Sequence, residues 1–425
     1  MRQQYSFIYD QDFISKALQL ANRESHAVYL NPNAYDYPYQ SFKHVLAFGA
    51  LKRSEPKPGQ NFDALQQFLD SNKDWTFGYF SYDLKNELEQ MSSKNEDRVN
   101  FPLIDFFIPK HLIFFHENNK AELHSVEKPE EVFSMILKEE LREEIPFGKI
   151  EIQQKISKEV YIEKVKKLQE LILRGALYET NFCMEYFAEG VKLDPLSVYS
   201  KLNKLSPMPF SCYLKAHDHY LICASPERFL KKEKQKLISQ PIKGTAKRDS
   251  DPLKDRENLT ALENNQKERS ENIMIVDLVR NDLARSAKQG TVKVEELCKV
   301  YSFPKVHQMI STVTSEIAED THSIEAIKKA FPMGSMTGAP KVRAMQLIDE
   351  YEETSRGLFS GSVGYFSPEM DFDFNVVIRS ILYNAKTNYI SFQAGSAITY
   401  YADAEKEYEE CGIKTAAIRE ILASL

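Results

Sequence analysis

Two pairs of glutamates in the C-terminal half of the sequence have a spacing that would let the carboxylates of each pair bind the same ligand. Glu268 and Glu271, and likewise Glu407 and Glu410, stand three residues apart, so each pair would share one face of a helix. Converging carboxylates without a supporting His or Cys are the oxygen ligands that a hard cation such as Mg²⁺ prefers. Acidic residues at this spacing also commonly hydrate an exposed helix face, so the spacing alone leaves both interpretations open.

A lysine stands in an unusual setting in the stretch SQPIKGTAKR, residues 239–248. Lys243 follows an apolar pair and precedes a Gly-Thr turn. A neutral lysine amine is a nucleophile, whereas a lysine at the end of a strand can also simply keep its amine in solvent. A nucleophilic Lys243 needs a lowered pKa, which partial burial or a neighbouring cation such as Lys247, Arg248 or a bound metal would supply.

Helices and strands must position these residues. The segment SKEVYIEKVKKLQELILRG predicts a helix with Ser157 as its N-cap and Gly175 at its C-terminal end. The segments SCYLKA, HYLICAS and KQKLISQPIKG have the composition of strands, and the run KKEKQK predicts an exposed hairpin turn. Several strands with few short helices between them indicate an α+β fold rather than a doubly wound parallel sheet. A soft boundary near residue 150 would separate regions 1–150 and 151–425.

The segment FPMGSMTGAPKVRAMQLIDEYE predicts a loop followed by a helix. Pro340 suits the first helical turn, and the apolar spacing predicts a buried stripe. The stripe would comprise Val342, Met345, Leu347 and Ile348. Free N–H groups at the start of this helix could bind a carboxylate or phosphate, but Gly-rich helix starts are also ordinary turns.

The composition narrows the class of protein. The 425 residues carry a formal net charge of -7, which argues against a broad nucleic-acid surface. No apolar run approaches the roughly 18 to 20 residues that span a bilayer, and the N-terminus lacks the apolar core of a signal peptide, so we expect a cytoplasmic protein. The scattered cysteines predict reduced, structural thiols. They are Cys183, Cys212, Cys223, Cys298 and Cys411.

A series of motifs over residues 157–425 resembles the chorismate-utilising enzymes. This family includes component I of anthranilate and aminodeoxychorismate synthases, isochorismate synthases and salicylate synthases. The motifs, in order, are GALYETNF, SPMPFSCYL, SPERFL, PIKGTAKR, KERSENIMIVDLVRNDLAR, VHQMIS, MGSMTGAPKVRAM, SGSVGYF, FNVVIRS, AGSAI and EYEECGIKTAA. A weaker match, WTFGYFSYD, lies nearer the N-terminus. The resemblance implies a large α+β sandwich of β-sheets flanked by helices, with the N-terminal region intertwined with it.

The resemblance also implies a reaction. Anthranilate synthases commonly carry PIAGT where this sequence has PIKGT, a form found in aminodeoxychorismate synthases. Lys243 would attack carbon 2 of chorismate as the carbon 4 hydroxyl leaves, and ammonia would then enter at carbon 4. The product would be 4-amino-4-deoxychorismate. Anthranilate formation is the alternative, and a catalytically silent chorismate-binding subunit is an alternative of another class.

The roles of further residues follow from the resemblance position by position. Glu227 would protonate the leaving hydroxyl, or otherwise pair with Arg228 or another cation in the interior. His307 matches a family active-site histidine. Glu271 and Glu410 match direct Mg²⁺ ligands, and Glu268 and Glu407 match ligands that act directly or through water. The positions that match substrate contacts are Gly244, Thr245, Arg379 and a backbone loop of Gly395, Ser396 and Ala397.

Some positions depart from the family pattern. Glu179 stands where glutamine-dependent members usually have Gln and isochorismate synthases have a water-activating Lys, which argues against water activation by lysine. Phe359 replaces a Tyr of anthranilate synthases, and Ala397 replaces the last Gly of AGAG. An LLES motif is missing, so tryptophan binding is not expected.

The sequence also lacks a glutaminase nucleophile motif, so a separate glutaminase subunit would supply ammonia. A downstream aminodeoxychorismate lyase would then form 4-aminobenzoate for folate synthesis.

Overall fold

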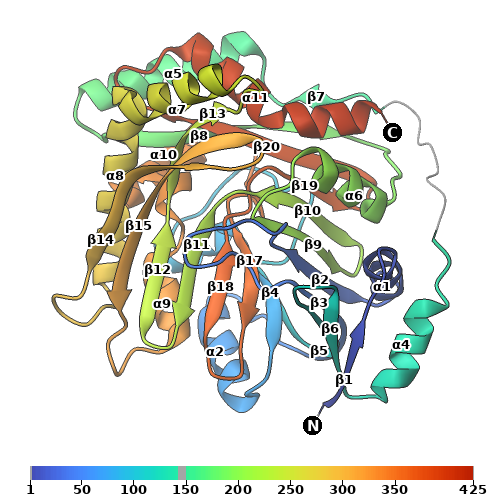
Figure 1. The fold of residues 1–425 in the computed structure, drawn as a ribbon. Coiled ribbons are helices and arrows are strands. Elements are labelled where there is room, and N and C mark those ends of the chain that lie inside the picture. The colour runs from blue at the N-terminus through green and yellow to red at the C-terminus, as the bar shows by residue number, and fades with distance from the viewer. Residues whose placement is uncertain (1, 142–149, 425) are drawn as a thin grey trace.

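A computed structural model describes residues 2–141 and 150–424 of the protein. The described strands join one another in a large antiparallel network, and helices cover its edges and outer faces, so the predicted α+β fold is confirmed (Figure 1). Helices α5 (Lys158–Leu173) and α11 (Ala404–Ala423) pack together over β8 (Glu179–Ala188) and β20 (Tyr389–Ile398). Among the described residues, no helix combines the length and the apolar composition that crossing a bilayer requires.

The remaining elements have the following bounds. The helices are α1 (Phe13–Ala21), α2 (Asn61–Ser71), α3 (Lys85–Leu88), α4 (Pro129–Leu137), α6 (Pro195–Leu205), α7 (Pro252–Asn264), α8 (Gln266–Ala284), α9 (Ser323–Ala330) and α10 (Lys341–Tyr351), with short 3-10 turns at Tyr82–Leu84 and Gly334–Met336. The strands are β1 (Gln3–Ile8), β2 (His26–Asn31), β3 (Val45–Arg53), β4 (Thr76–Phe80), β5 (Ile104–Phe115), β6 (Lys120–Ser125), β7 (Gln153–Gln154), β9 (Phe210–Ala216), β10 (His219–Ser225), β11 (Arg228–Glu233), β12 (Lys236–Gln240), β13 (Ile242–Lys247), β14 (Lys293–Ser302), β15 (Val306–Glu316), β16 (Gly338–Ala339), β17 (Ser362–Phe366), β18 (Phe372–Asn375) and β19 (Ser380–Asn384).

The N-terminal region is intertwined with the rest of the chain. Strand β2 pairs with β9, and β4 pairs with β17, so hydrogen bonds join residues on both sides of position 150. The division into regions 1–150 and 151–425 stays a prediction, and residues 142–149 beside it lie outside the described residues.

Local sequence signals locate several elements correctly. Ser157 caps α5 by accepting a hydrogen bond from the backbone N–H of Val160, and Gly175 follows the helix with φ of 77°. The charged run KKEKQK forms the hairpin between β11 and β12. In α10, Met345, Leu347 and Ile348 are buried, but Val342 is 41% exposed, so its predicted place in the stripe is wrong. Val342 lies in the first turn, where it faces away from the core.

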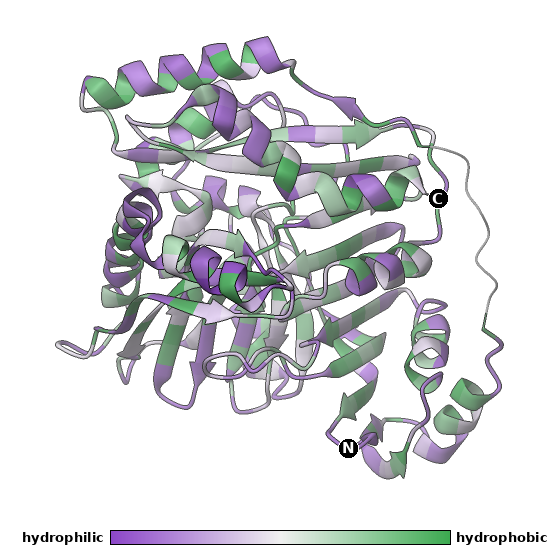
Figure 2. Ribbon diagram, turned by 45° about the horizontal axis from the view of Figure 1, so that its top comes forward, coloured by the Kyte–Doolittle hydropathy of each residue, from purple (hydrophilic) through white to green (hydrophobic). Residues whose placement is uncertain are grey.

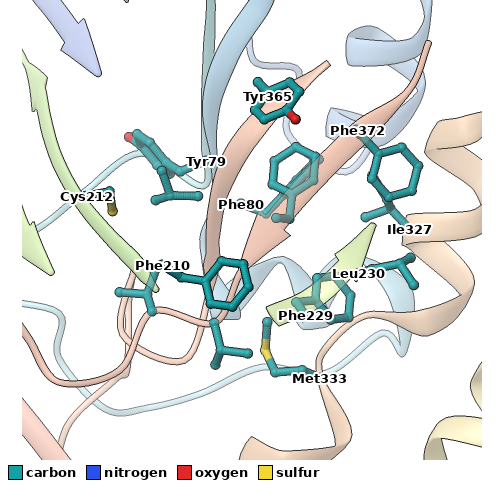
Figure 3. Packing of buried hydrophobic residues seen from close by; sticks show 14 of the residues in the cluster. Tyr79, Phe80, Phe210, Cys212, Phe229, Leu230, Ile327, Met333, Tyr365 and Phe372 are labelled. Atoms are coloured by element: carbon teal, nitrogen blue, oxygen red, sulfur yellow. The ribbon is translucent and has the colours of Figure 1, made fainter. Parts of the chain in front are cut away.

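Aromatic side chains from distant segments fill the largest core. Phe80 of β4, Phe210 of β9, Phe229 of β11 and Phe372 of β18 belong to one buried cluster, seen at close range in Figure 3. Their burial removes large apolar surfaces from water, the main favourable contribution to folding. The outer helices alternate between hydrophilic and hydrophobic residues, as Figure 2 shows, because one face packs on this framework and the other meets solvent.

Candidate active site

A β-bulge places Lys243 on strand β13. Pairing with β15 runs from Ile242 opposite Ile310 to Thr245 opposite Gln308, with a register shift between them. An extra residue in one strand re-aims the side chains around it. Gly244 has φ of +89°, and a Cβ atom there would lie 3.0 Å from Leu262 and 3.2 Å from Glu268, so both backbone and space favour glycine. The bulge therefore directs Lys243 inward from a strand on which Thr245 and Lys247 are exposed.

The Lys243 ammonium forms an ion pair with Glu179. Its Nζ donates a hydrogen bond of 3.2 Å to Glu179 Oε1, and the two side chains are only 12% and 1% exposed. Burial by itself would lower the pKa of Lys243, as predicted, but the carboxylates of Glu179 and Glu271 outweigh burial and raise it above its ordinary value. The expected lowered pKa is therefore wrong for this structure, because acidic neighbours rather than cations surround the amine.

Glu227 has the surroundings of an acid that keeps its proton near neutral pH. Burial raises the pKa of its carboxyl to about 7, even though the Ser335 hydroxyl and the Lys243 ammonium favour the ionised form. The alternative pairing with Arg228 does not occur. Arg228 instead forms a bidentate ion pair with Asp373, with N···O distances of 2.9 and 3.0 Å. Glu227 is thus not paired with Arg228, and the cations that act on its carboxyl are Lys243 and Lys414.

The two predicted carboxylate pairs lie on helices as expected. Glu268 and Glu271 belong to α8, and Glu407 and Glu410 belong to α11. A residue that the sequence reasoning missed, Lys267, links the two helices. Its Nζ lies 2.8 Å from Glu407 Oε1 and 3.8 Å from Glu271 Oε1. Across the described parts of the chain, no three His, Cys, Asp or Glu side chains already form a metal-binding cluster.

The chemistry of these four carboxylates nevertheless fits a hard divalent cation. Glu271 Oε1 is buried and receives no hydrogen bond from the described residues, and burial raises the pKa of Glu271 to about 7 despite the nearby Lys243 and Lys267. Burial likewise raises the pKa of Glu407, whereas in Glu410 the Lys414 ammonium outweighs partial burial and lowers it. Carboxylates held in such poorly solvated positions gain from a cation with oxygen preference.

His307 is buried and makes hydrogen bonds through both ring nitrogens. Its Nε2 lies 3.0 Å from Asp255 Oδ1, and its Nδ1 lies 2.8 Å from the Ser302 hydroxyl. Asp255 also pairs with Arg248, whose guanidinium Nε lies 2.8 Å away. His307 sits opposite Ala246 in the β13–β15 ladder, on the strand that pairs with the one carrying Lys243. Its part in the site stays a prediction, and these contacts are those of a residue that orients β13.

The predicted substrate contacts at 395–397 lie in a strand rather than in a loop. Gly395 pairs with Cys183 of β8, and a Cβ atom at Gly395 would lie 2.4 Å from the Cys183 sulfur, which excludes larger residues. The Ser396 hydroxyl is bonded to Tyr161 of α5, 2.8 Å away, and Ala397 is buried opposite Asn181. This stretch therefore offers backbone groups and one tightly packed glycine rather than a mobile segment.

Two cations converge beside this strand. The Lys414 Nζ donates to Gly395 O at 2.7 Å and to Glu410 Oε1 at 2.6 Å. Arg379, in a left-handed conformation with φ of 53°, donates to the Lys414 carbonyl at 3.2 Å. Lys414 was missed because nothing in its local sequence separates it from other helix-surface lysines. Together, Arg379 and Lys414 give this side of the site positive charge suited to a carboxylate.

The strand that carries Glu179 is fixed by a buried network that the sequence did not reveal. Gly338 of β16 has φ of 148°, and a Cβ atom there would lie 2.1 Å from the Glu179 carbonyl oxygen. Arg356 donates to the carbonyls of Asn181 and Met336 at 2.8 and 2.6 Å. It is itself held by Glu352 at 2.7 Å. The motif MGSMTGAP therefore acts as a brace for β8.

These features define a class of protein. Residues 24–420 match the family described as chorismate binding enzyme, and the chain belongs to that family. It is 33% identical to aminodeoxychorismate synthase component 1 of Escherichia coli strain K12, over 90% of each chain. It is 31% identical to anthranilate synthase component 1 of Thermus thermophilus, over 80% of this chain and 76% of that protein. The sequence-based recognition of the family is thereby confirmed.

Solved structures agree on the fold. Anthranilate synthase component I from Streptococcus pneumoniae superposes with a TM-score of 0.79 at 24% identity, covering 91% of this chain and 93% of that one. The menaquinone-specific isochorismate synthase MenF from Escherichia coli superposes with a TM-score of 0.80 at 16% identity, covering 99% and 95%. These likenesses concern the fold, which confirms the expected α+β architecture.

Proposed function

We propose that this protein is the synthase component of aminodeoxychorismate formation, which aminates chorismate at ring carbon 4. The observation that carries the proposal is Lys243 on the bulge of β13, whose amine lies 3.2 Å from the Glu179 carboxylate and near enough to Glu227, a carboxyl with a raised pKa, to act on its charge. Relatives at 33 to 35% identity bear the name aminodeoxychorismate synthase component 1, which supports the same assignment. Anthranilate synthesis is the second candidate, because a relative of similar identity bears that name.

The first half of the reaction forms a covalent adduct. Lys243 passes one proton to Glu179, 3.2 Å away, and its freed electron pair forms a bond to carbon 2 of chorismate. The double bond shifts as the bond between carbon 4 and its oxygen breaks, and Glu227 donates its proton so that water leaves. A carboxyl with a pKa of about 7 holds that proton at neutral pH and can also release it.

The second half restores the lysine. Ammonia forms a bond to carbon 4, the double bond shifts back, and the bond from carbon 2 to Lys243 breaks with its electron pair returning to nitrogen. Lys243 then recovers its proton from Glu179, and the new ammonium at carbon 4 returns a proton to Glu227. The balance is chorismate plus ammonia giving 4-amino-4-deoxychorismate plus water.

Magnesium completes the proposed site. Glu271 and Glu410 would bind Mg²⁺ directly, and Glu268 and Glu407 would do so directly or through water. When bound, the ion would hold the ring carboxylate and offset its negative charge. Arg379 and Lys414 would bind the substrate from the side of β20, where the Lys414 ammonium donates to the Gly395 carbonyl and the Arg379 guanidinium donates to the Lys414 carbonyl. Gly244 and Thr245 would contact the ring from β13.

Ammonia would come from a separate glutaminase subunit. A glutaminase nucleophile needs an accessible, activated thiol, whereas all five cysteines here are buried. Burial raises the pKa of the Cys411 thiol to about 11, which makes it a poor nucleophile. The product would pass to an aminodeoxychorismate lyase, which forms 4-aminobenzoate for folate synthesis. Both partners belong to the proposal.

Product analysis tests the proposal. Purified protein is incubated with chorismate, MgCl₂ and an ammonium salt at alkaline pH, with and without added aminodeoxychorismate lyase, and the products are separated by chromatography and weighed by mass spectrometry. Formation of 4-aminobenzoate only when lyase is present is the expected result. Anthranilate would transfer the assignment to the second candidate.

Two variants test the covalent role of Lys243 separately from the amination reaction itself. Lys243→Met keeps an apolar stem but removes the nucleophile, so 4-amination should fall at least about 100-fold, with Lys247→Met, further along the same strand and exposed, as the matched control. Wild-type rates in Lys243→Met would remove the covalent route while leaving the amination itself in place.

A further inference from the structure

A small cavity lies between Glu227 and helix α8. Its polar wall includes Glu227, Ser335 and Asp282, and its apolar wall includes Val279 and Met333. The space open to the centre of a water molecule is about 20 Å³, and one water needs about 10 to 15 Å³ by this measure. The cavity is therefore large enough for a single water molecule and too small for a substrate.

Two polar groups that line this cavity have unused hydrogen-bonding capacity. The Ser335 hydroxyl is buried and has no hydrogen bond of ordinary geometry to any described residue, although it lies near enough to Glu227 to favour the ionised carboxyl. The carboxylate of Asp282, which is 6% exposed, accepts one hydrogen bond within the described part of the chain, from Lys341 to Oδ2 at 2.6 Å. Buried polar groups in this state cost free energy and are commonly completed by an ordered water.

The other polar side chains of the wall are already engaged. Arg228 donates from all three of its guanidinium nitrogens to groups that do not line the cavity. Ser239 donates its hydroxyl to a backbone carbonyl at 2.8 Å. A water in the cavity would therefore find its partners in Glu227, Ser335 and Asp282.

We propose that this cavity binds one water molecule, which links Glu227 to Asp282 and positions the Glu227 carboxyl. The water would accept a hydrogen bond from the Ser335 hydroxyl and donate one each to Asp282 and to one oxygen of Glu227. Three hydrogen bonds are the usual number for a buried water. Because the Glu227 oxygen that faces the cavity then accepts a hydrogen bond, the acid proton is left on the other oxygen, where the proposed reaction uses it. Asp282 and Ser335 are positioning residues in this arrangement.

Contacts between α8 and the loop that carries Ser335 fix the walls of the cavity. Lys341 joins the two, because its ammonium donates to Asp282 and to two backbone carbonyls that precede Ser335, at 2.6, 3.0 and 2.9 Å. A Cβ atom at Gly334 would lie 2.9 Å from the Leu278 side chain of α8, so the loop and the helix pack closely. The cavity therefore keeps its size before a substrate arrives.

The first test is a crystal structure of the full chain at a resolution that shows ordered solvent. We expect a water within hydrogen-bonding distance of Glu227, Ser335 and Asp282. A cavity without solvent density would overturn the inference. This test does not depend on the proposed function, whereas the effect of the water on catalysis rests on it.

Val279→Ile tests that effect on catalysis. Val279 lines the cavity from α8, and the added methyl group is similar in size to a water, so the variant should displace the water without removing a polar group. With ammonium and MgCl₂ saturating, kcat for amination should fall at least about tenfold, because a loosely held acid raises the barrier of the chemical step. KM for chorismate should stay within about twofold.

Val276→Ile is the matched control. Val276 is also buried on α8 but does not line the cavity. The control adds the same methyl group to the same helix, so it should leave kcat unchanged while costing similar stability in urea unfolding. Ser335→Ala keeps the space and removes one partner of the water, so kcat should fall about three- to tenfold, the loss typical of one hydrogen bond.

Three kinetic results would also overturn the inference. Wild-type kcat in Val279→Ile would mean that no water in the cavity positions Glu227, and an equal loss in Val276→Ile would mean that overpacking of α8 alone lowers the rate. A rise in KM for chorismate with unchanged kcat would make the cavity part of the substrate site. Failure of the proposed function is recognised separately, because wild-type protein would then form no 4-aminated product, whether or not the crystal structure shows the water.

Discussion

Replacing Glu227 by Gln tests whether the protein holds a protonated carboxylic acid in its interior. Glu227 is 5% exposed, and burial raises the pKa of its carboxyl from 4.5 to about 7. The amide of Gln has nearly the same shape and cannot ionise. Comparing the two proteins at different pH values therefore isolates the titration of this one group, since other carboxyls with raised pKa values, such as Glu271, titrate in both.

The direction in which the free energy of unfolding changes with pH follows from the number of protons that the folded and unfolded chains bind. Between pH 4.5 and 7 the unfolded chain has released the Glu227 proton while the folded chain retains it, so the free energy of unfolding falls as pH rises through this window. A shift of about 2.5 pKa units at 1.36 kcal/mol per unit corresponds to about 3 kcal/mol. Relative to Glu227→Gln, the wild type should thus lose about 3 kcal/mol between about pH 4.5 and pH 8, and little more above that.

Urea unfolding of both proteins at about pH 5 and pH 8 measures this difference, with the exposed Glu409→Gln as a control whose effect should not change with pH. Amination by Glu227→Gln should fall about 100-fold or more, the usual contribution of a general acid. A stability difference that changes by less than about 1 kcal/mol between the two pH values would refute the protonated state.

Three further predictions concern a lysine beside the proposed metal ligands, a buried ion pair and a glycine with positive φ. Lys267→Met removes the ammonium 2.8 Å from Glu407 and should raise Mg²⁺ affinity about fivefold or more in calorimetric titration. Asp373→Asn leaves the Arg228 guanidinium without its charge partner in the interior and should lower the free energy of unfolding in urea by about 3 to 5 kcal/mol. Gly244→Ala introduces a Cβ atom at a φ of +89° beside Leu262 and should reduce kcat for ammonia-dependent amination at least about tenfold through displacement of Lys243.

Each of these has a control in the same chain. Lys406→Met removes an exposed amine from α11 and should leave Mg²⁺ affinity unchanged. Asp371→Asn breaks a more exposed ion pair with Lys232, which should cost about 1 kcal/mol or less. Gly290→Ala meets a similar φ of +77° in open space and should not alter kcat. Equal effects in variant and control would contradict the corresponding prediction.

Short-range sequence patterns were sufficient to predict several helices and to recognise the family. Helix α5 could be predicted because an N-cap serine, apolar residues at helical spacing and a following glycine act within a few residues of one another. The glutamates of α8 and α11 lie on helices for the same reason. The motif series was sufficient to recognise the family, and the PIKGT stretch singled out Lys243 before any contact was known.

Only the tertiary structure decided how these residues act on one another. Lys243 meets Glu179 across 64 residues, and Lys267 meets Glu407 across 140. Such distant contacts set the direction of the Lys243 pKa, which the sequence alone suggested would fall. The same holds for residues 395–397, which the resemblance implied to be a loop and which instead pair with β8 as part of β20. Spacing along the chain determines local geometry, whereas charge and solvation in the interior depend on which distant strands and helices the core brings together.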